Sequence, residues 1–498
     1  MAISIINIAR NSLKFSSVNF LAALISMPVT IYSATILVPE EYGIYGLLGL
    51  WLMYAGLIGP GFAAAGQREM PVLLGKGKER EALEIQNISL SAEILYTIIP
   101  FVVIIGASFF YSSTVLKLGL IIIAASYVAI RLASFWSGTN FIRERFNVVA
   151  KGNLIVAILT PLAILTGVNW LGVYALLVAP LIANAVVWVY YLKKGAINYH
   201  FKFDRSETVK LVKVGVVLQA LGFLFWAFRL ADRTIIAAML PLEQLGVYVF
   251  AMQFIMVMLQ IPTDFGNVLT PILWREAGKA DSIFEGFKDL SRIAIYLALG
   301  TAVLIPIGQL GFYLAVSLIT TNYIGSIPIF YVLSYNLYLA SMGIVPALIL
   351  NSSIVNRQKI SLYCYSIGLA LNIIFGILVV KLGYGVVGVA WVTICTQGLA
   401  TFILYRFIKG YIFRDVKEFV RFQLRTLFPF LITIPFYFLH NYLNSVTSNL
   451  WTFAGISLAT QVILWSVVIR IFYRDYLSIS DIKALIREVG IAIKRQIA

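Results

Sequence analysis

An apolar segment at 214–240 carries charged side chains in a place where charge is costly. It is long enough to cross a bilayer, and it contains Arg229 and Arg233. Charges inside a membrane usually face other helices or a water-filled cavity. The two arginines lie four residues apart and share a helical face with Gln219 and Trp226. Because guanidinium groups can bind phosphate through paired hydrogen bonds, this face predicts a cavity that binds an anionic substrate.

Asp232 offers a different interpretation of the same charges. It follows Arg229 by three residues and precedes Arg233 directly, so its carboxylate could pair with either guanidinium group within the helix. One arginine would then remain charged. We therefore expect Asp232 to be structural and both arginines to be cavity candidates, although Arg233 lies nearer the outer interface and could extend toward it.

A second polar face is predicted in the next apolar segment, 244–270. Gln253, Gln260, Asp264 and Asn267 follow one another at spacings of 7, 4 and 3 residues, which places them on one helical face. Such a face could contact sugar, bind a coupling cation or join packed helices through hydrogen bonds. Asp264 is the candidate for proton or sodium coupling, and Gln253 and Gln260 are candidates for substrate binding.

Glu93 and Arg131 are the other charges within apolar segments. They lie in consecutive segments, each roughly 8–10 Å from the inner end at about 1.5 Å per residue. We expect a structural ion pair between them. The sequence contains no zinc-ligand spacing, nucleophile motif or phosphate-binding loop, so we expect no metal, no cofactor and no enzymatic activity.

The composition is that of a membrane protein. Hydrophobic residues make up 60% of the 498 residues and charged residues 12%, with a mean hydropathy of +0.91. Soluble domains carry about 25% charged residues, so we expect an all-α polytopic membrane protein. Fourteen segments could span the bilayer: 16–37, 43–64, 88–110, 117–138, 150–168, 171–192, 214–239, 244–270, 292–317, 325–350, 361–380, 384–406, 424–441 and 449–470.

The distribution of positive charge supports this topology. With both termini in the cytoplasm, 33 of the 38 lysines and arginines fall in inner loops or termini, two in outer loops and three within spans. Cationic loops are retained on the cytoplasmic side. The net charge of +16 therefore reflects insertion into a cell membrane, and we expect no nucleic-acid partner.

An internal repeat relates the two halves of the chain. The turn ILVPEEYGIYGL at 36–47 returns as MLPLEQLGVYVF at 239–250, about 203 residues later. Each turn joins two spans, so we expect two similar six-helix bundles related by an axis along the membrane normal. The predicted parts are a bundle at 1–192, a cytoplasmic linker at 193–213, a second bundle at 214–406, two further helices at 407–475 and an amphipathic cytoplasmic tail at 476–498.

The chain resembles the polysaccharide (O-antigen) flippases of the multidrug/oligosaccharidyl-lipid/polysaccharide exporter superfamily. The resemblance rests on NSLKF before the first span, the PEEYGIYGL turn, GQREMPVLLGKGKEREA at 66–82, LGVYALLVAPLIANAVVWVYYL at 171–192 and FRLADRTIIAAMLPLEQLGVY at 228–248. It implies two bundles around a central cavity and alternating access. Where the family often has an acidic residue at the end of span 2, this chain has Gly61, while Asp264 stands at the corresponding place in span 8.

The resemblance also implies a substrate and partners. The substrate would be a lipid-linked oligosaccharide of the polyprenyl diphosphate type, moved from the cytoplasmic to the outer leaflet for surface polysaccharide biosynthesis. Arg229 and Arg233 would bind the diphosphate, and Trp226, Phe225 and Phe228 would offer stacking surface. Membrane lipids are further partners, as are, by association, a polysaccharide polymerase or glycosyltransferases.

Other classes remain as alternatives. Ion-coupled drug exporters of the superfamily usually have twelve spans, whereas fourteen are expected here. Lipid II flippases have many cavity arginines in the first half, where the spans of this chain contain only Arg131. A membrane glycosyltransferase would need carboxylates in a large outer loop, and the predicted outer loops are all short.

Overall fold

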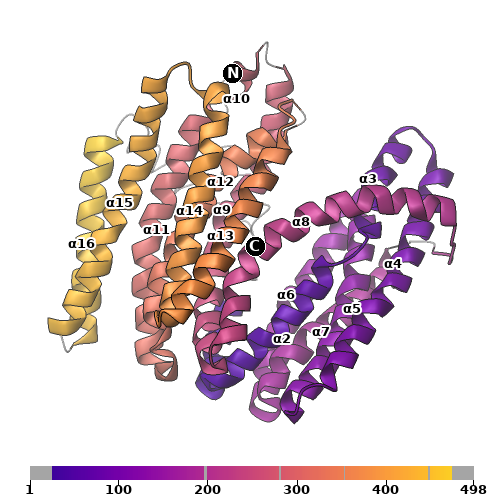
Figure 1. Ribbon diagram of the computed structural model, residues 1–498, viewed down its shortest axis with the longest axis horizontal. Helices are drawn as coiled ribbons and strands as arrows, with labels where there is room; N and C mark the ends of the chain where they lie inside the picture. The colour runs from indigo at the N-terminus through magenta and orange to yellow at the C-terminus, as the bar shows by residue number, and fades with distance from the viewer. Residues whose placement is uncertain (1–24, 196–198, 280–281, 353, 447–448, 474–498) are drawn as a thin grey trace. The chain divides into compact units, whose positions relative to one another are not determined.

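The computed structural model describes residues 25–195, 199–279, 282–352, 354–446 and 449–473 (Figure 1). Within these ranges the chain forms α-helices and one short 3-10 helix, and it contains no strand. The predicted all-α class is therefore confirmed for this part of the chain. The predicted amphipathic tail at 476–498 lies outside the described residues.

Two compact units divide the described chain, at 24–249 and from residue 250 onward. The division falls inside a helix, α9, so α8 clusters with the helices that precede it. The first unit contains Ile25–Ile36, α2 (Pro39–Leu57), α3 (Phe62–Gly75), α4 (Glu79–Ser108), α5 (Thr114–Ile142), α6 (Phe146–Leu171), α7 (Val173–Lys194), α8 (Arg205–Met239) and the start of α9 (Leu242–Lys279).

The second unit holds the rest of α9 and the helices that follow it. These are α10 (Ile283–Phe287), α11 (Leu290–Leu318), the 3-10 helix η1 (Thr321–Tyr323), α12 (Ser326–Leu350), α13 (Gln358–Lys381), α14 (Gly385–Ile412), α15 (Val416–Val446) and α16 (Leu450–Phe472). An aromatic cluster packs the unit, and in it the rings of Phe312 and Phe330 stack at 4.0 Å between centroids.

Eleven helices in the described residues are long and apolar enough to cross a membrane, and α2 with α3 would make a twelfth. The chain is thus a multi-pass membrane protein. Within the described residues, each of the fourteen segments expected from hydropathy overlaps a helix, but Ile25–Ile36 is short and α8 is not among the eleven. The count of fourteen spans and the organisation into two repeated bundles remain predictions.

The start of α2 follows directly from its sequence. Pro39 occupies the first turn, where its missing N–H leaves no hydrogen bond unmade. The Glu41 carboxylate accepts a hydrogen bond from the Val38 amide at 3.0 Å. Glu40 and Glu41 also complement the positive end of the helix dipole. These residues fix the turn that the repeat comparison singled out.

Candidate functional site

The helix direction changes sharply at the junction of α2 and α3 in the first unit. The axes of the two helices are bent by 47° relative to each other, and Gly61 at the break has a φ of 73°, a left-handed value that favours glycine. A Cβ atom on Gly61 would lie 2.4 Å from the carbonyl oxygen of Gly215 in α8, and one on Gly215 would lie 2.4 Å from that of Pro60. The break and α8 therefore meet backbone to backbone, and only glycine fits.

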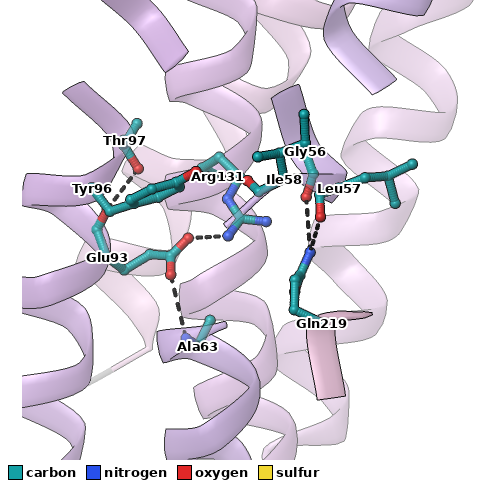
Figure 2. A network of polar contacts seen from close by, with 9 residues as sticks. All are labelled: Gly56, Leu57, Ile58, Ala63, Glu93, Tyr96, Thr97, Arg131 and Gln219. Atoms are coloured by element: carbon teal, nitrogen blue, oxygen red, sulfur yellow. Dashed lines mark hydrogen bonds and ion pairs between the residues drawn. The ribbon is translucent and has the colours of Figure 1, made fainter. Parts of the chain in front are cut away.

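Side chains from two other helices bind the end of α2 at this break (Figure 2). The Gln219 amide in α8 donates to the carbonyl oxygens of Leu57 at 2.7 Å and Gly56 at 3.4 Å. The Tyr96 hydroxyl in α4 donates to the carbonyl oxygen of Ile58 at 2.9 Å. The last carbonyls of a helix lack partners within the helix, and a bilayer offers no water to replace them. These contacts satisfy carbonyl oxygens at the end of α2.

The start of α3 is held by a buried ion pair. The Glu93 carboxylate accepts from the backbone amide of Ala63 at 3.3 Å and from the Arg131 guanidinium (Figure 2). The Glu93 residue is 3% exposed, and the side chain of Arg131 is about a quarter exposed. A buried carboxylate needs such a partner, because an uncompensated charge there would be strongly destabilising. The structure thus brings together the two residues paired from sequence and adds α3 to their contact.

Arg229 lies against aromatic side chains of its own helix. Its guanidinium carbon is 4.5 Å from the ring centroid of Phe225 and 5.9 Å from that of Trp226. Both distances fall within the range of cation–π attraction. Trp226 is 41% exposed. The structure therefore groups a fixed cation with two aromatic rings on α8.

Asp232 binds a residue that sequence reasoning missed. Its carboxylate accepts a hydrogen bond from the Tyr248 hydroxyl in α9, and another from the Arg233 backbone amide at 2.7 Å. Asp232 and Tyr248 are both buried, and Arg233 is partly buried. In the sequence, Tyr248 stands out only as part of the repeated turn at 239–250. That pattern gives no sign that its hydroxyl reaches back to the preceding helix.

The start of α2 touches the start of α9. A Cβ atom on Gly43 would lie 1.9 Å from the carbonyl oxygen of Leu242, and one on Gly246 would lie 1.7 Å from that of Pro39. Both backbones approach too closely for any side chain at these positions. Figure 1 shows α8 passing α3 and α2, against which it packs.

We call this line of contacts the α2–α8 seam. It begins where α2 meets the start of α9, at Gly43 and Gly246 with Leu242 and Pro39. It continues along α8 through the Tyr54–Thr234 hydroxyl pair at 2.7 Å, the Gln219 amide on Leu57 and the Gly61–Gly215 contact. Contacts therefore join the two sides of the seam at both ends and in the middle.

The polar face of α9 is partly assembled in the second unit. The Gln260 amide donates to the Asp264 carboxylate at 2.8 Å, and Asp264 is 1% exposed. Gln253 lies on the same helix and is partly buried. The Asn267 side chain lies outside the described residues. Among those residues, no group of three or more His, Cys, Asp or Glu side chains could hold a metal ion.

A groove of about 720 Å³ opens at the predicted cytoplasmic side of the first unit. Its walls combine apolar side chains with charges of both signs, and carboxylates outnumber cations. The lining residues are Arg68, Glu69, Val72, Leu73, Glu81, Glu84, Ile85, Ile88, Lys202, Asp204, Glu207 and Val214. The sequence analysis attributes the loop charges to topology, and nothing in the sequence shows that α3, α4, α8 and the residues just before α8 bring them together.

This architecture is shared with solved structures of flippases and transporters. "Lipid II flippase MurJ, inward closed conformation" has a TM-score of 0.71 and 16% identity, covering 93% of this chain and 99% of that one. An inward-facing multidrug resistance MATE family transporter of the MOP superfamily scores 0.66 at 13% identity, over 78% and 94%. A MOP superfamily transporter from Pyrococcus furiosus scores 0.57 at 12%, over 85% and 99%. At such identities the likeness establishes the fold.

The sequence establishes the family. Residues 33–323, more than half of the chain, match the model described as "Polysaccharide biosynthesis protein". The chain belongs to this polysaccharide biosynthesis family, as the resemblance noted from its motifs implied. No curated protein matches the sequence significantly.

Proposed function

We propose that this protein is a flippase that moves lipid-linked oligosaccharide from the cytoplasmic to the outer leaflet by alternating access. The observation that carries the proposal is the grouping of Arg229 with Phe225 and Trp226 on α8, in a chain of the polysaccharide biosynthesis family. Both termini would lie in the cytoplasm, as the positive charge of the inner loops indicates.

The chemistry of the substrate fits this grouping. A polyprenyl diphosphate oligosaccharide has an anionic diphosphate, a polar sugar chain and an apolar tail. Arg229 would bind the diphosphate with a charge that does not titrate. The rings of Phe225 and Trp226 already hold its guanidinium group and would offer an apolar face to sugar. Arg233 would add a second cation one turn further along α8.

The α2–α8 seam suits a transporter that opens one end at a time. Its contacts at the two ends are separate, and each involves backbone atoms of few residues. Separation at one end would expose the adjacent face of α8 while the other end stays shut. In this proposal Glu93 and Arg131 keep α3 attached to α4 and α5 during the movement.

The polar face of α9 would serve ion coupling. Asp264 is a buried carboxylate whose oxygen is held by Gln260, and it could exchange that contact for a proton or a sodium ion. Gln253 and Gln260 would contact substrate when it lies beside α9. These roles belong to the proposal and can be tested separately from the anion site.

The test is transport in vesicles that contain purified protein and a fluorescent polyprenyl-diphosphate oligosaccharide. Arg229→Ala should weaken substrate binding by roughly 10- to 100-fold, because a charge-assisted hydrogen bond contributes about 1.5–3 kcal/mol. Arg229→Lys should retain part of the activity, and Lys117→Ala, which removes an exposed cation, should match wild type. Wild-type rates in Arg229→Ala would refute the anion site, and absence of transport by wild type would refute the flippase.

A multidrug exporter is the second candidate, and the groove is the observation that favours it. Apolar side chains such as Val72 and Ile88 face carboxylates such as Glu69 and Glu207, which suits an organic cation. Cells that express the protein would then export ethidium, and Glu69→Gln with Glu207→Gln would abolish export. A lipid II flippase remains a variant of the leading proposal, to be distinguished by offering lipid II to the same vesicles.

A further inference from the structure

A strongly basic patch lies where α14 ends and α15 begins, within the second unit. Between residues 406 and 425 the chain has six lysines and arginines but only two carboxylates. We call the six cations the α15 basic patch. They are Arg406, Lys409, Arg414, Lys417, Arg421 and Arg425. The patch belongs to the predicted cytoplasmic side of the protein, where positive charge is expected.

The two carboxylates of this segment are used by the backbone. The Glu418 carboxylate accepts a hydrogen bond from the Arg414 amide at 3.0 Å, and the Asp415 carboxylate accepts one from the Glu418 amide at 2.6 Å. They stabilise the start of α15, where the first amides of the helix have no partner within it. No ion pair in the described part of the chain includes any of the first five cations of the patch.

Other inner cations are compensated within the protein. Just before and within the start of α8, Lys202 pairs with Glu84 at 2.9 Å and Lys210 with Glu207 at 2.6 Å. Retention of a loop in the cytoplasm requires only that the loop be cationic. Topology therefore explains why both segments are basic, but it does not explain why the α15 basic patch lacks such pairs. Its charge remains available to an anion from outside the protein.

Buried aromatic rings hold the patch in shape. The ring of Phe413, which directly follows α14, lies 5.4 Å from that of Phe419 and 4.8 Å from that of Phe422, both in α15. The Lys409 ammonium lies 5.9 Å from the centroid of Phe419, within the range of cation–π attraction. These contacts join the end of α14 to the start of α15, so the cations are presented by a packed framework.

An apolar row of α15 runs beside its cations. Lys417 and Arg421 are exposed and lie four residues apart, on one face of the helix. Val416, Val420 and Leu424 follow the same spacing and are also exposed, Leu424 by 63%. Each residue of a helix is rotated by about 100° from the one before it, so the two rows are neighbours. In a membrane-spanning helix the exposed apolar row faces lipid chains.

We propose that the α15 basic patch binds the phosphate group of an anionic phospholipid of the inner leaflet. The acyl chains of that lipid lie along the apolar row, and its headgroup lies on the cations beside it. The Arg421 guanidinium donates two hydrogen bonds to the phosphate oxygens, and the Lys417 ammonium adds a second charge. Complementary charge and the adjoining apolar row together favour a lipid over a soluble anion. This site is separate from the transported substrate and does not depend on the proposed function.

The first test measures binding of short-chain phosphatidylglycerol to the purified full-length protein in neutral detergent by native mass spectrometry. Lys417→Gln/Arg421→Gln should weaken binding by roughly 30-fold, because each cation near an anionic headgroup contributes about a factor of five. Lys193→Gln/Lys194→Gln removes the same charge from the exposed end of α7 and should leave binding unchanged. Equal losses in the two double variants would overturn the site, and displacement by an equal concentration of inorganic phosphate would overturn its assignment to a lipid.

A second measurement locates the lipid while keeping every cation in place. Val420→Cys, in a background of Cys364→Ser and Cys395→Ser, would carry a bimane fluorophore in phosphatidylcholine nanodiscs. Brominated phosphatidylglycerol should quench this fluorophore more strongly than an equal amount of brominated phosphatidylcholine. Leu192→Cys is the matched control, since Leu192 is exposed beside the two control lysines of α7, and there both lipids should quench alike. The same preference at both positions, or none at Val420, would refute the proposal.

Discussion

Gly246 contacts the backbone of Pro39 so closely that a Cβ atom would lie 1.7 Å from the Pro39 carbonyl oxygen. The reverse contact, Gly43 on the carbonyl oxygen of Leu242, has the same form. In the repeated turns Pro39 corresponds to Leu242 and Gly43 to Gly246. In each turn, the glycine contacts the carbonyl oxygen that the equivalent position of the other turn provides. Such a reciprocal contact is the pattern of a local two-fold relationship.

Gly246→Ala should open the outer end of the α2–α8 seam. The added methyl cannot fit without backbone movement, and overpacking of this kind costs about 1–3 kcal/mol. We expect faster labelling, from the outer side, of a cysteine placed at Thr234 in a background of Cys364→Ser and Cys395→Ser. Gly49→Ala is the matched control, because a Cβ atom there meets nothing within 4 Å. Equal labelling in both variants would contradict the role of the glycine contact.

Removal of Glu93 should destabilise the first unit through Arg131. Breaking a buried pair costs about 3–5 kcal/mol, and the partial exposure of Arg131 places Glu93→Ala at the lower end. Thermal unfolding in detergent should show that Glu93→Ala/Arg131→Gln loses less than the sum of the two single variants. Additive losses would mean that the pair does not act as a unit.

Tyr248→Phe should destabilise the junction of α8 and α9. The change leaves the buried Asp232 carboxylate without one of its donors, at a cost of about 1–3 kcal/mol. Asp232→Asn in the same protein should recover part of the loss, since a neutral amide needs less compensation. A Tyr248→Phe protein with wild-type thermal stability would show that the hydroxyl contributes nothing there.

The contact between Lys202 and Glu84 should weaken in acid. The Lys202 ammonium donates to the Glu84 carboxylate at 2.9 Å and lowers the pKa of that carboxyl. Because the folded-state pKa is the lower one, the contribution to stability is complete above the unfolded-state pKa and is lost as the pH falls through the folded-state value. The stability difference between wild type and Lys202→Met should shrink in acid, whereas Lys193→Met should show no such trend.

Hydropathy and charge predict most of the helices, because a bilayer requires each span to be apolar and favours cationic loops on one side. Both signals can be read from each short stretch of the sequence alone. Glu93 and Arg131 could be paired from sequence, since consecutive spans are antiparallel and both residues lie at similar depth. The helix at 214–239 was likewise expected, with Arg229 near its aromatic neighbours. In each case the information lies within one span or between two adjacent spans.

Contacts between distant segments could not be predicted in this way. The role of Gln219 in substrate binding stays a prediction, but the bond from its amide nitrogen to Leu57, 162 residues away, has no signal in the sequence. The break in span 2 depends on Gly61 meeting Gly215, and no period or charge count relates those positions. From sequence, Asp232 was expected to pair with an arginine of its own helix. Its hydrogen bond with Tyr248 of the next helix has no signal in the sequence.

The bend between α2 and α3 also affects how the helix dipoles are placed. A continuous helix places its dipole ends at the two membrane surfaces, whereas the break leaves the negative end of α2 and the positive end of α3 near residues 58–61. Each end carries roughly half an elementary charge, and a full charge that crosses the membrane potential changes energy by about 2.3 kcal/mol per 100 mV. A movement that displaces the start of α3 would therefore make the transport rate depend on voltage, which vesicles with an imposed potassium gradient can measure.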